Sequence, residues 1–363
     1  MSSFFGQHVR LSLFGQSHGE GIGITIDGFP AGMTVDMQAL SAMMARRAPG
    51  QSVMTTARRE ADLPEFLSGL LDGRTTGQPI AAVIRNTNQH SGDYGDGVDL
   101  ARPGHADYTG HVRYFGFEDW RGGGHFSGRL TAPIVLAGAL CMQWLAAQGV
   151  RIECHVKQLG DLVDDSLLDV PETQDLSHLK TMALPVLREG LDREMEAAVL
   201  AARERQDSVG GVLECRAVGL PAGLGAPFFD SVESVLSHLL FSIPAVKGVS
   251  FGEGFGFAAL PGSEANDPLR MDGECVVTAT NHAGGVNGGI TNGMPVVFQC
   301  VIRATPSIAQ PQKTVSLKAM ENADIAIRGR HDPCILPRAV PVVEAMTAIG
   351  LMELWKERAA CVR

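Results

Sequence analysis

The sequence has little positive charge. Its 363 residues include 30 Lys and Arg against 40 Asp and Glu, which gives a formal net charge of −10 at pH 7. Nucleic-acid binding depends on a basic surface that neutralises phosphates, so we predict no nucleic-acid partner. If the protein binds an anionic ligand, positive charge must be gathered at one site.

Paired cysteines and long apolar runs are also missing. The seven cysteines are odd in number, widely spaced and without a CxxC pair. This pattern favours reduced thiols in a cytoplasmic protein and predicts neither a disulfide framework nor a metal site. The N-terminus lacks the apolar core of a signal peptide. The most apolar run, 130–145, contains Pro133 and Gln143 and is shorter than a membrane span of ~20 residues, so we interpret it as a buried helix and expect no membrane partner.

Two common nucleotide-binding motifs are absent. No GxGxxG sequence lies between a predicted strand and a helix, and no GxxxxGK[ST] loop occurs. The standard dinucleotide and nucleoside-triphosphate sites are therefore not predicted. The chain has no repeat or low-complexity linker, and its 45% hydrophobic residues suffice for a substantial core, as one large domain or two closely packed ones.

Hydrophobic periodicity predicts a mixture of helices and strands. Strands are expected at 21–29, 81–87, 211–220 and 295–304. Helices are expected at 37–47, 130–148, 186–206, 231–241 and 341–359. Because the elements alternate irregularly, an α+β fold is favoured over a regular βαβ alternation.

Glycine, with 43 residues, is abundant and clustered around histidines and arginines. FGQSHGEGIG (14–23) places His18 beside Ser17, either as an incidental loop histidine or where backbone can approach a ligand. RRAPGQSVMTTARRE (46–60) holds four arginines, which could form a solvated helix end or clamp a phosphate or carboxylate. ARPGHADYTG (101–110) presents His105 after a Pro-Gly turn, near Arg102, as a general acid would be.

Two further segments have the same character. WRGGGHFSGRL (120–130) could be a hinge, but three glycines before a helix also make an anion site from backbone amides. NHAGGVNGGITNG (281–293) has five glycines, and IRGRHDPCILPRAVP (327–341) surrounds Asp332 with arginines. That aspartate is either a carboxylate base or part of a structural salt-bridge cluster. Together the segments predict an enzyme that acts on an anionic, phosphorylated small molecule.

The runs FGQSHG, RPGHAD, RGGGHFSGR, NHAGGVNGGITNG and GRHDPCILPRAVPVVEAM, in this order, resemble the chorismate synthase family. The resemblance extends from the N-terminus to about Leu351. It implies a lyase of the shikimate pathway of aromatic amino acid biosynthesis, which eliminates phosphate and a ring hydrogen from 5-enolpyruvylshikimate 3-phosphate to give chorismate. It also implies reduced FMN as cofactor without net redox change, and a single domain over 1–363 folded as a β-α-β sandwich and assembled as a homotetramer.

The resemblance assigns catalytic roles to five residues. His18 matches the histidine that protonates the departing phosphate, and His105 matches the one that protonates the reduced flavin. Asp332 matches the carboxylate that takes a proton from flavin N5. Ser17 and Ser127 match serines of the proton relay. Phosphate departure needs an acid in cationic surroundings, so the residue types agree with the chemistry.

The resemblance also implies binding residues. Those expected at the flavin are His125, Phe126, Ser127, Pro244, Ala245, Gly288, Arg303, Ala304, Thr305, Pro306, Ser307 and Arg330. Arg47 matches a position linked to NADP, and Arg46, Arg129 and Arg328 are expected at the substrate.

The chain departs from the usual family pattern at a few positions, including Val53, where an arginine is frequent. We therefore favour reduction of the flavin by an external reductase, with NADPH as an indirect reductant. Two alternatives stay open: an FMN-dependent enzyme of the same fold with another substrate, and a non-catalytic flavin-binding relative.

Overall fold

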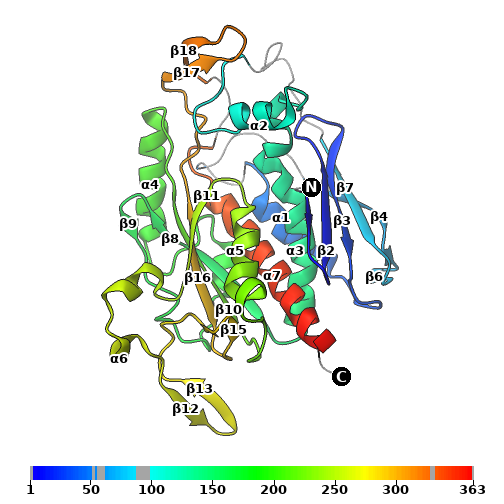
Figure 1. The fold of residues 1–363 in the computed structure, drawn as a ribbon, viewed down its shortest axis with the longest axis vertical. Helices are drawn as coiled ribbons and strands as arrows, with labels where there is room; N and C mark the ends of the chain where they lie inside the picture. Colours follow the sequence, from blue (N-terminus) through cyan, green and yellow to red (C-terminus); the bar gives the residue numbers. More distant parts are fainter. Residues whose placement is uncertain (1–2, 51–53, 55–61, 87–98, 328–331, 362–363) are drawn as a thin grey trace.

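The computed structural model describes residues 3–50, 54, 62–86, 99–327 and 332–361 (Figure 1). Several residues singled out in the sequence lie outside these ranges: Val53, Arg58, Arg59, Arg328, Arg330 and His331.

Two five-stranded antiparallel sheets form the outer layers of the molecule. The first sheet has the order β1 (Phe4–Phe5), β2 (Arg10–Gly15), β3 (Gly21–Asp27), β7 (Ile80–Arg85) and β4 (Pro64–Ser68). The second has the order β11 (Val246–Phe251), β16 (Val296–Ile302), β10 (Gly211–Val218), β8 (Arg151–Leu159) and β9 (Leu162–Val163).

A layer of helices lies between the two sheets (Figure 1). It contains α1 (Met37–Arg47), α3 (Thr131–Ala146), α5 (Val232–Phe241) and α7 (Leu336–Cys361). One hydrophobic core runs through all three layers and includes Ile24 of β3, Leu140 of α3 and Cys215 of β10. The predicted α+β fold and β-α-β sandwich are therefore confirmed.

The remaining elements lie around these layers. The helix α2 (Asp107–Tyr114) lies at the upper end of the molecule, and α4 (Leu191–Glu204) lies outside the second sheet (Figure 1). The short elements are α6 (Gly262–Ala265) and the hairpins β5–β6 (Leu70–Leu71, Arg74–Thr75), β12–β13 (Leu269–Asp272, Cys275–Thr278), β14–β15 (Val286–Asn287, Ile290–Thr291) and β17–β18 (Gln312–Ser316, Glu321–Ile325).

The helix α3 is apolar because it is buried among the other layers. The stretch Arg121–Ala146 is long and apolar enough to cross a membrane, but 78% of its apolar window is buried inside the protein, as in a core helix. Gly138 lets α3 approach α7 closely, because a Cβ at this position would lie 2.3 Å from Ala345. The interpretation of 130–145 as a buried helix agrees with this packing.

Two helices begin five residues away from their predicted starts. The helix α7 begins five residues earlier than predicted, and Pro341 lies within its second turn, where a proline removes only one backbone donor. The predicted helix at 186–206 begins only at Leu191, because Gly190 before it has a left-handed backbone with φ +83°.

The C-terminal helix α7 anchors the beginning of the chain. Glu353 is 8% exposed, and its carboxylate accepts the backbone N–H groups of Gln7, His8 and Val9 at 2.6 to 3.1 Å. Four hydrogen bonds to one carboxylate satisfy both the buried charge and three backbone donors.

A buried ionic trio lies within the second sheet. His155 on β8 is fully buried, with Nδ1 3.0 Å from Asp164 and Nε2 3.1 Å from Glu214 on β10. Burial acts to lower the pKa of His155, but hydrogen bonds to the two carboxylates outweigh it and raise that pKa. Burial acts to raise the pKa of the Asp164 and Glu214 carboxyl groups. Hydrogen bonds from His155 and from backbone N–H groups outweigh it, so both pKa values are lowered.

Candidate functional site

The triple-glycine loop is the centre of the candidate site. Gly122, Gly123 and Gly124 all have positive φ, between 54° and 83°, within a distorted turn at Arg121–Phe126. The helix α3 begins only at Thr131, so these amides do not form its N-terminus, and the anion site expected there is not built in that way. The glycines serve instead to let side chains approach the backbone, since a left-handed turn without Cβ atoms leaves that space open.

Gly122 lies against His18 and Ser17, on the loop between β2 and β3. A Cβ on Gly122 would lie 2.3 Å from His18 Cδ2, 2.4 Å from His18 Nε2 and 3.1 Å from Ser17 Oγ. The backbone N–H of Ser17 also donates to the carbonyl of Gly124 at 3.1 Å. Ser17 and His18 are 3% and 5% exposed, so the loop holds a buried imidazole at a defined place.

Gly123, the next residue, lies against His105. A Cβ here would lie 3.4 Å from both Cε1 and Nε2 of His105 and 3.8 Å from Cβ of Ser127. The triple-glycine loop thus brings together four of the five residues predicted to be catalytic, from three separate segments between positions 17 and 127. Proton-transfer groups can act on one ligand only when they converge in this way.

His105 has an acidic partner that the sequence analysis did not select. Its Nδ1 lies 2.6 Å from Oδ1 of Asp107, the first residue of α2. Arg102 donates to both oxygens of that carboxylate at 2.7 Å. Burial acts to raise the pKa of the Asp107 carboxyl, but hydrogen bonds from Arg102 and His105 outweigh it and hold that pKa well below its usual range. Its place in the RPGHAD run was the signal that could have indicated it.

A second carboxylate lies beside the loop. Asp119 accepts two hydrogen bonds from the Arg121 guanidinium, at 2.7 and 2.8 Å. These bonds lower the pKa of the Asp119 carboxyl against the effect of its partial burial, and the charge of His18 adds to the lowering. Asp119 therefore contributes negative charge near His18.

Asn86, just beyond β7, connects the His18 loop to the arginines. Its side-chain amide donates to the carbonyls of Gln16 and Gly19, at 3.0 and 2.9 Å. Its amide oxygen accepts from Nε of Arg129 at 2.5 Å. Asn86 was not selected from the sequence, because a single asparagine at a strand end carries no motif.

Asp62 joins two of the predicted binding arginines. Its fully buried carboxylate lies 2.7 Å from Arg47 on one oxygen and 2.7 Å from Arg129 on the other. Arg47 is 3% exposed and also donates to Thr131 and to the carbonyl of Gly128. Burial and the neighbouring Arg338 lower the pKa of Arg47 to about 10, and Asp62 opposes this shift. The guanidinium of Arg47 thus faces protein groups on all sides.

Asp332 lies at the other end of the same network. Arg338 Nη1 lies 2.5 Å from its carboxylate, and Arg338 Nε donates to the carbonyl of Arg47 at 3.0 Å. The predicted base therefore connects through Arg338, Arg47 and Asp62 to Arg129. Arg328, expected at the substrate, and Arg330, expected at the flavin, are outside the described residues.

Arg46 points elsewhere, toward the helical layer. Its guanidinium makes two hydrogen bonds, at 2.6 and 3.0 Å, to Glu344 of α7, whose side chain is 1% exposed. The pairing balances a buried carboxylate, which would otherwise be costly. The structure therefore gives Arg46 a packing partner, and its substrate contact stays a prediction.

The predicted flavin contacts fall into two groups. Arg303, next to β16, donates to the carbonyl of Gly104 at 3.0 Å, and its backbone N–H donates to Ala245. This brings Pro244, Ala245 and the segment Arg303–Ser307 next to the turn that carries His105. Gly288 lies beyond the opposite end of β16, a strand of seven residues and thus ~20 Å long. One chain therefore does not bring Gly288 to the other contacts.

His125 and Phe126 have structural contacts. His125 Nδ1 lies 2.9 Å from the carbonyl of Gly15, and its Nε2 lies 2.9 Å from Ser3 Oγ. Phe126 stacks at a tilt on Tyr114 of α2, with ring centroids 6.1 Å apart, and covers Gly110. Both residues brace the glycine loop against its neighbours, and their flavin contacts stay predictions.

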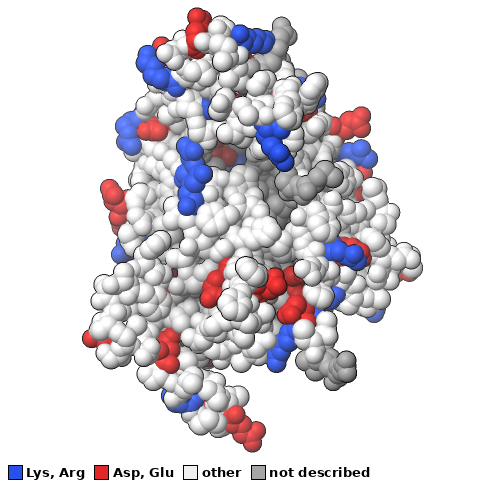
Figure 2. Space-filling view, viewed as in Figure 1, with Lys and Arg blue, Asp and Glu red and all other residues white. Residues whose placement is uncertain are grey.

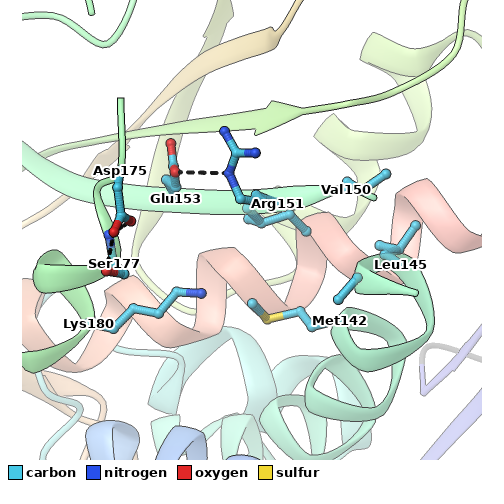
Figure 3. Close-up of a pocket in the computed structure, with 10 residues that line it drawn as sticks. Met142, Leu145, Val150, Arg151, Glu153, Asp175, Ser177 and Lys180 are labelled. Carbon is cyan, nitrogen blue, oxygen red and sulfur yellow. Dashed lines mark hydrogen bonds and ion pairs between the residues drawn. The ribbon is translucent and has the colours of Figure 1, made fainter. Parts of the chain in front are cut away.

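Basic side chains lie in the same part of the molecule as the candidate site (Figure 2), whereas a cavity at the end of α3 does not. Basic side chains are prominent in the upper half of the face shown in Figure 2, where α2 and β17–β18 lie, although the chain is acidic overall. A cavity of about 140 Å³ lies elsewhere, between the end of α3 and the beginning of β8 (Figure 3). It is lined by Met142, Arg151 and Lys180 among others, and by none of the predicted site residues.

Comparison with known proteins gives a consistent result. The family model described as chorismate synthase matches residues 9–355. A chorismate synthase of Dehalococcoides mccartyi is 42% identical over 355 residues, which cover 98% of this chain and 96% of that protein. One from Pyrococcus abyssi is 44% identical over 350 residues, covering 96% of each. A solved structure, "Crystal Structure of Chorismate Synthase", has a TM-score of 0.77 and 27% identity, and the match covers 98% of this chain and 93% of that one. With both sequence and fold matched over nearly its full length, the chain belongs to the chorismate synthase family, a family of lyases.

Proposed function

We propose that the residues gathered on the triple-glycine loop carry out the chorismate synthase reaction of this chain. The substrate, 5-enolpyruvylshikimate 3-phosphate, loses phosphate and a ring hydrogen to give chorismate. The observation that carries the proposal is the placement of His18 and His105 against the adjacent glycines Gly122 and Gly123. Two imidazoles at one loop can serve two proton transfers on one bound ligand.

The proposed roles follow from these positions. His18 protonates the departing phosphate, and Ser17, beside it at Gly122, relays the proton. His105 exchanges a proton at the edge of its ring that faces Gly123, next to Ser127. Asp332, held by Arg338, is the base that accepts the proton derived from the substrate. Arg129 and Arg338 supply positive charge around the anionic ligand.

The residues present fit a flavin. Thr305 Oγ1 is buried and has no hydrogen-bond partner among the described residues, which suits a ligand with polar edges. Ala245, Arg303 and Thr305 would hold FMN beside His105, through the contact of Arg303 with Gly104. When bound, reduced FMN supplies an electron to the elimination and takes it back, so the reaction has no net redox change.

Reduction of the flavin is proposed to be external. Arg47, the predicted NADP contact, is 3% exposed and already bonded to Asp62, Thr131 and Gly128. Enzyme mixed aerobically with FMN, substrate and NADPH should form no chorismate until a flavin reductase is added. Chorismate formed with NADPH alone would show an intrinsic reductase.

A homotetramer is proposed as the assembly. The hairpin β12–β13 projects from the lower end of the molecule (Figure 1), with Leu269, Met271 and Val276 at least 54% exposed. An isolated two-stranded hairpin is only marginally stable in water, so a second copy is the natural partner for this surface. Gly288 could then reach a flavin from a neighbouring chain. Light scattering should give four times 38.5 kDa, and a monomer would refute the proposal.

The same proposal treats the chain as one domain working in the cytoplasm on a small molecule. One core cluster extends through both sheets and the helices, which supports a single cooperative unit. The relatives of bacteria and archaea with the same activity support the location.

The function is tested anaerobically with purified enzyme, the enolpyruvyl phosphate substrate and chemically reduced FMN. Chorismate and phosphate should appear in equal amounts. His18→Asn and His105→Asn should each lower kcat by ~100-fold or more, as expected for proton-transfer groups. His178→Asn, on an exposed turn, is the matched control and should keep full activity. Phosphate release without chorismate would overturn the proposal.

A further inference from the structure

Asp107 is a buried carboxylate in contact with His105, and the roles above give it no task. Its side chain is 6% exposed, and Oδ1 lies 2.6 Å from His105 Nδ1. This distance is shorter than the ~2.7 to 2.9 Å typical of strong N–H···O hydrogen bonds to carboxylates. Asp107 is therefore bonded to the histidine more tightly than a chance neighbour would be.

Arg102 fixes the direction of this carboxylate. Nε of Arg102 donates to Oδ2 and Nη2 donates to Oδ1, both at 2.7 Å, and the backbone N–H of Arg102 donates to Oδ2 at 2.9 Å. A two-pronged pairing of this kind restricts rotation of the carboxylate. Asp107 is therefore held as an ionised acceptor whose Oδ1 faces the imidazole.

The opposite edge of His105 faces the glycine loop. Both Cε1 and Nε2 lie 3.4 Å from the position that a Cβ of Gly123 would take. The two ring nitrogens thus have different surroundings. Nδ1 lies 2.6 Å from Oδ1 of Asp107 and 3.0 Å from Nη2 of Arg102, and Nε2 faces the proposed site. The carboxylate is the nearer of the two groups and the one that can accept a hydrogen bond, so a proton on Nδ1 is held by Asp107. The hydrogen bond made by one imidazole nitrogen decides which protonation state the other presents.

We propose that Asp107 is a positioning residue that keeps a proton on Nδ1 of His105, so that Nε2 is the nitrogen that exchanges protons in the reaction. The proposal rests on the function assigned to His105 above. In each exchange one proton joins or leaves Nε2, while Nδ1 keeps its own proton. Asp107 stays a carboxylate throughout and never touches the substrate.

A double-mutant cycle measures this coupling. Asp107→Asn should lower kcat by ~100-fold with KM changed less than about threefold, since proton transfer and not binding is affected. His105→Ala with Asp107→Asn should be no slower than His105→Ala alone, because Asp107 acts only through that ring. Multiplied losses in the double variant would overturn the proposal. Asp27→Asn, at an Asp–Arg pair with Arg10 far from the loop, is the matched control.

Chemical labelling of His105 tests the role of Asp107 without an activity assay. Diethyl pyrocarbonate modifies an unprotonated imidazole nitrogen, and peptide mass spectrometry of the full-length protein reports His105 separately. Asp107→Asn should slow labelling of His105 by about fivefold, because the proton can then move to Nε2. His111, on the helix α2 that begins at Asp107, should be labelled at the wild-type rate. Unchanged labelling of His105 would overturn the proposal.

Asp107→Glu keeps a carboxylate and guards against a folding effect. It should show kcat and labelling between those of the wild type and Asp107→Asn, and a loss equal to that of Asp107→Asn would count against the proposal. If the wild type forms no chorismate, the proposed function fails. Labelling of His105 still decides the role of Asp107 in that case, so the two failures are distinguishable.

Discussion

Substituting Gly122 with alanine tests the geometry of the site most directly. The added Cβ would lie 2.3 Å from His18 Cδ2, whereas carbon atoms in contact are about 3.5 to 4.0 Å apart. His18 is 5% exposed and cannot move freely, so its ring must shift by ~1 Å. A misplacement of this size can cost ~100-fold in rate, and we expect that loss in kcat.

Gly123→Ala provides the matched comparison. Both positions have positive φ, so both variants bear a similar backbone cost of about 1 to 2 kcal/mol. The Cβ on Gly123 would lie 3.4 Å from His105, which is close to an ordinary contact, so kcat should fall less than about tenfold.

The assay combines kcat under saturating reduced FMN with the melting temperature of each variant. Both variants should melt a few degrees lower, by similar amounts. Gly128→Ala, where a Cβ would meet nothing within 4 Å, should change neither quantity. Equal kcat for Gly122→Ala and Gly123→Ala would refute the argument, because backbone strain alone would then explain the loss.

Three other variants test the surroundings. Arg46→Ala should lower stability by about 3 to 5 kcal/mol by leaving Glu344 buried and unpaired, with KM unchanged; a higher KM at normal stability would instead favour a substrate contact. The raised pKa of His155 stabilises the fold below pH ~6.5. The lowered pKa values of its partners Asp164 and Glu214 stabilise the fold above pH ~4. His155→Gln should therefore lower the melting temperature most at about pH 5 to 6 and less as pH rises through the folded pKa of His155; a constant difference would contradict the charge argument. Gly138→Ala should cost about 1 to 3 kcal/mol in chemical denaturation, since α3 and α7 must separate at Ala345, and wild-type stability would refute that contact.

Much of the fold could be predicted from local patterns. The helix α1 has its predicted bounds, 37–47, because Asp36 caps its start and Pro49-Gly50 follows its end. The long strands β2 and β8 were not predicted. Both begin with alternating polar and apolar residues, RLSL in β2 and RIECHVK in β8, so the period-two signal was present and could have indicated them.

The candidate site shows the same division. Ser17, His18 and His105 could be selected from the sequence as candidate site residues, because glycine-rich segments surround them. Asp62 and Asn86 could not, because each is a single polar residue whose importance depends on long-range pairing with Arg129. The family resemblance supplied roles, but only the tertiary structure shows that Arg47 is enclosed and that Gly288 is distant from Arg303.

The hydrogen bonds between Glu353 and residues 7–9 also determine when the N-terminal part of the protein can complete its folding. Gln7 and Glu353 are 346 positions apart, so the first sheet lacks its anchor until the ribosome has made nearly the whole chain. At about 5 to 20 residues per second, the newly made N-terminal strands wait for roughly 20 to 70 s. Helix α3, which packs on β3 and β7, is made much earlier and can cover the sheet first. The backbone N–H groups of residues 7–9, by contrast, have no carboxylate partner until α7 has been made, so this corner of the sheet is completed last.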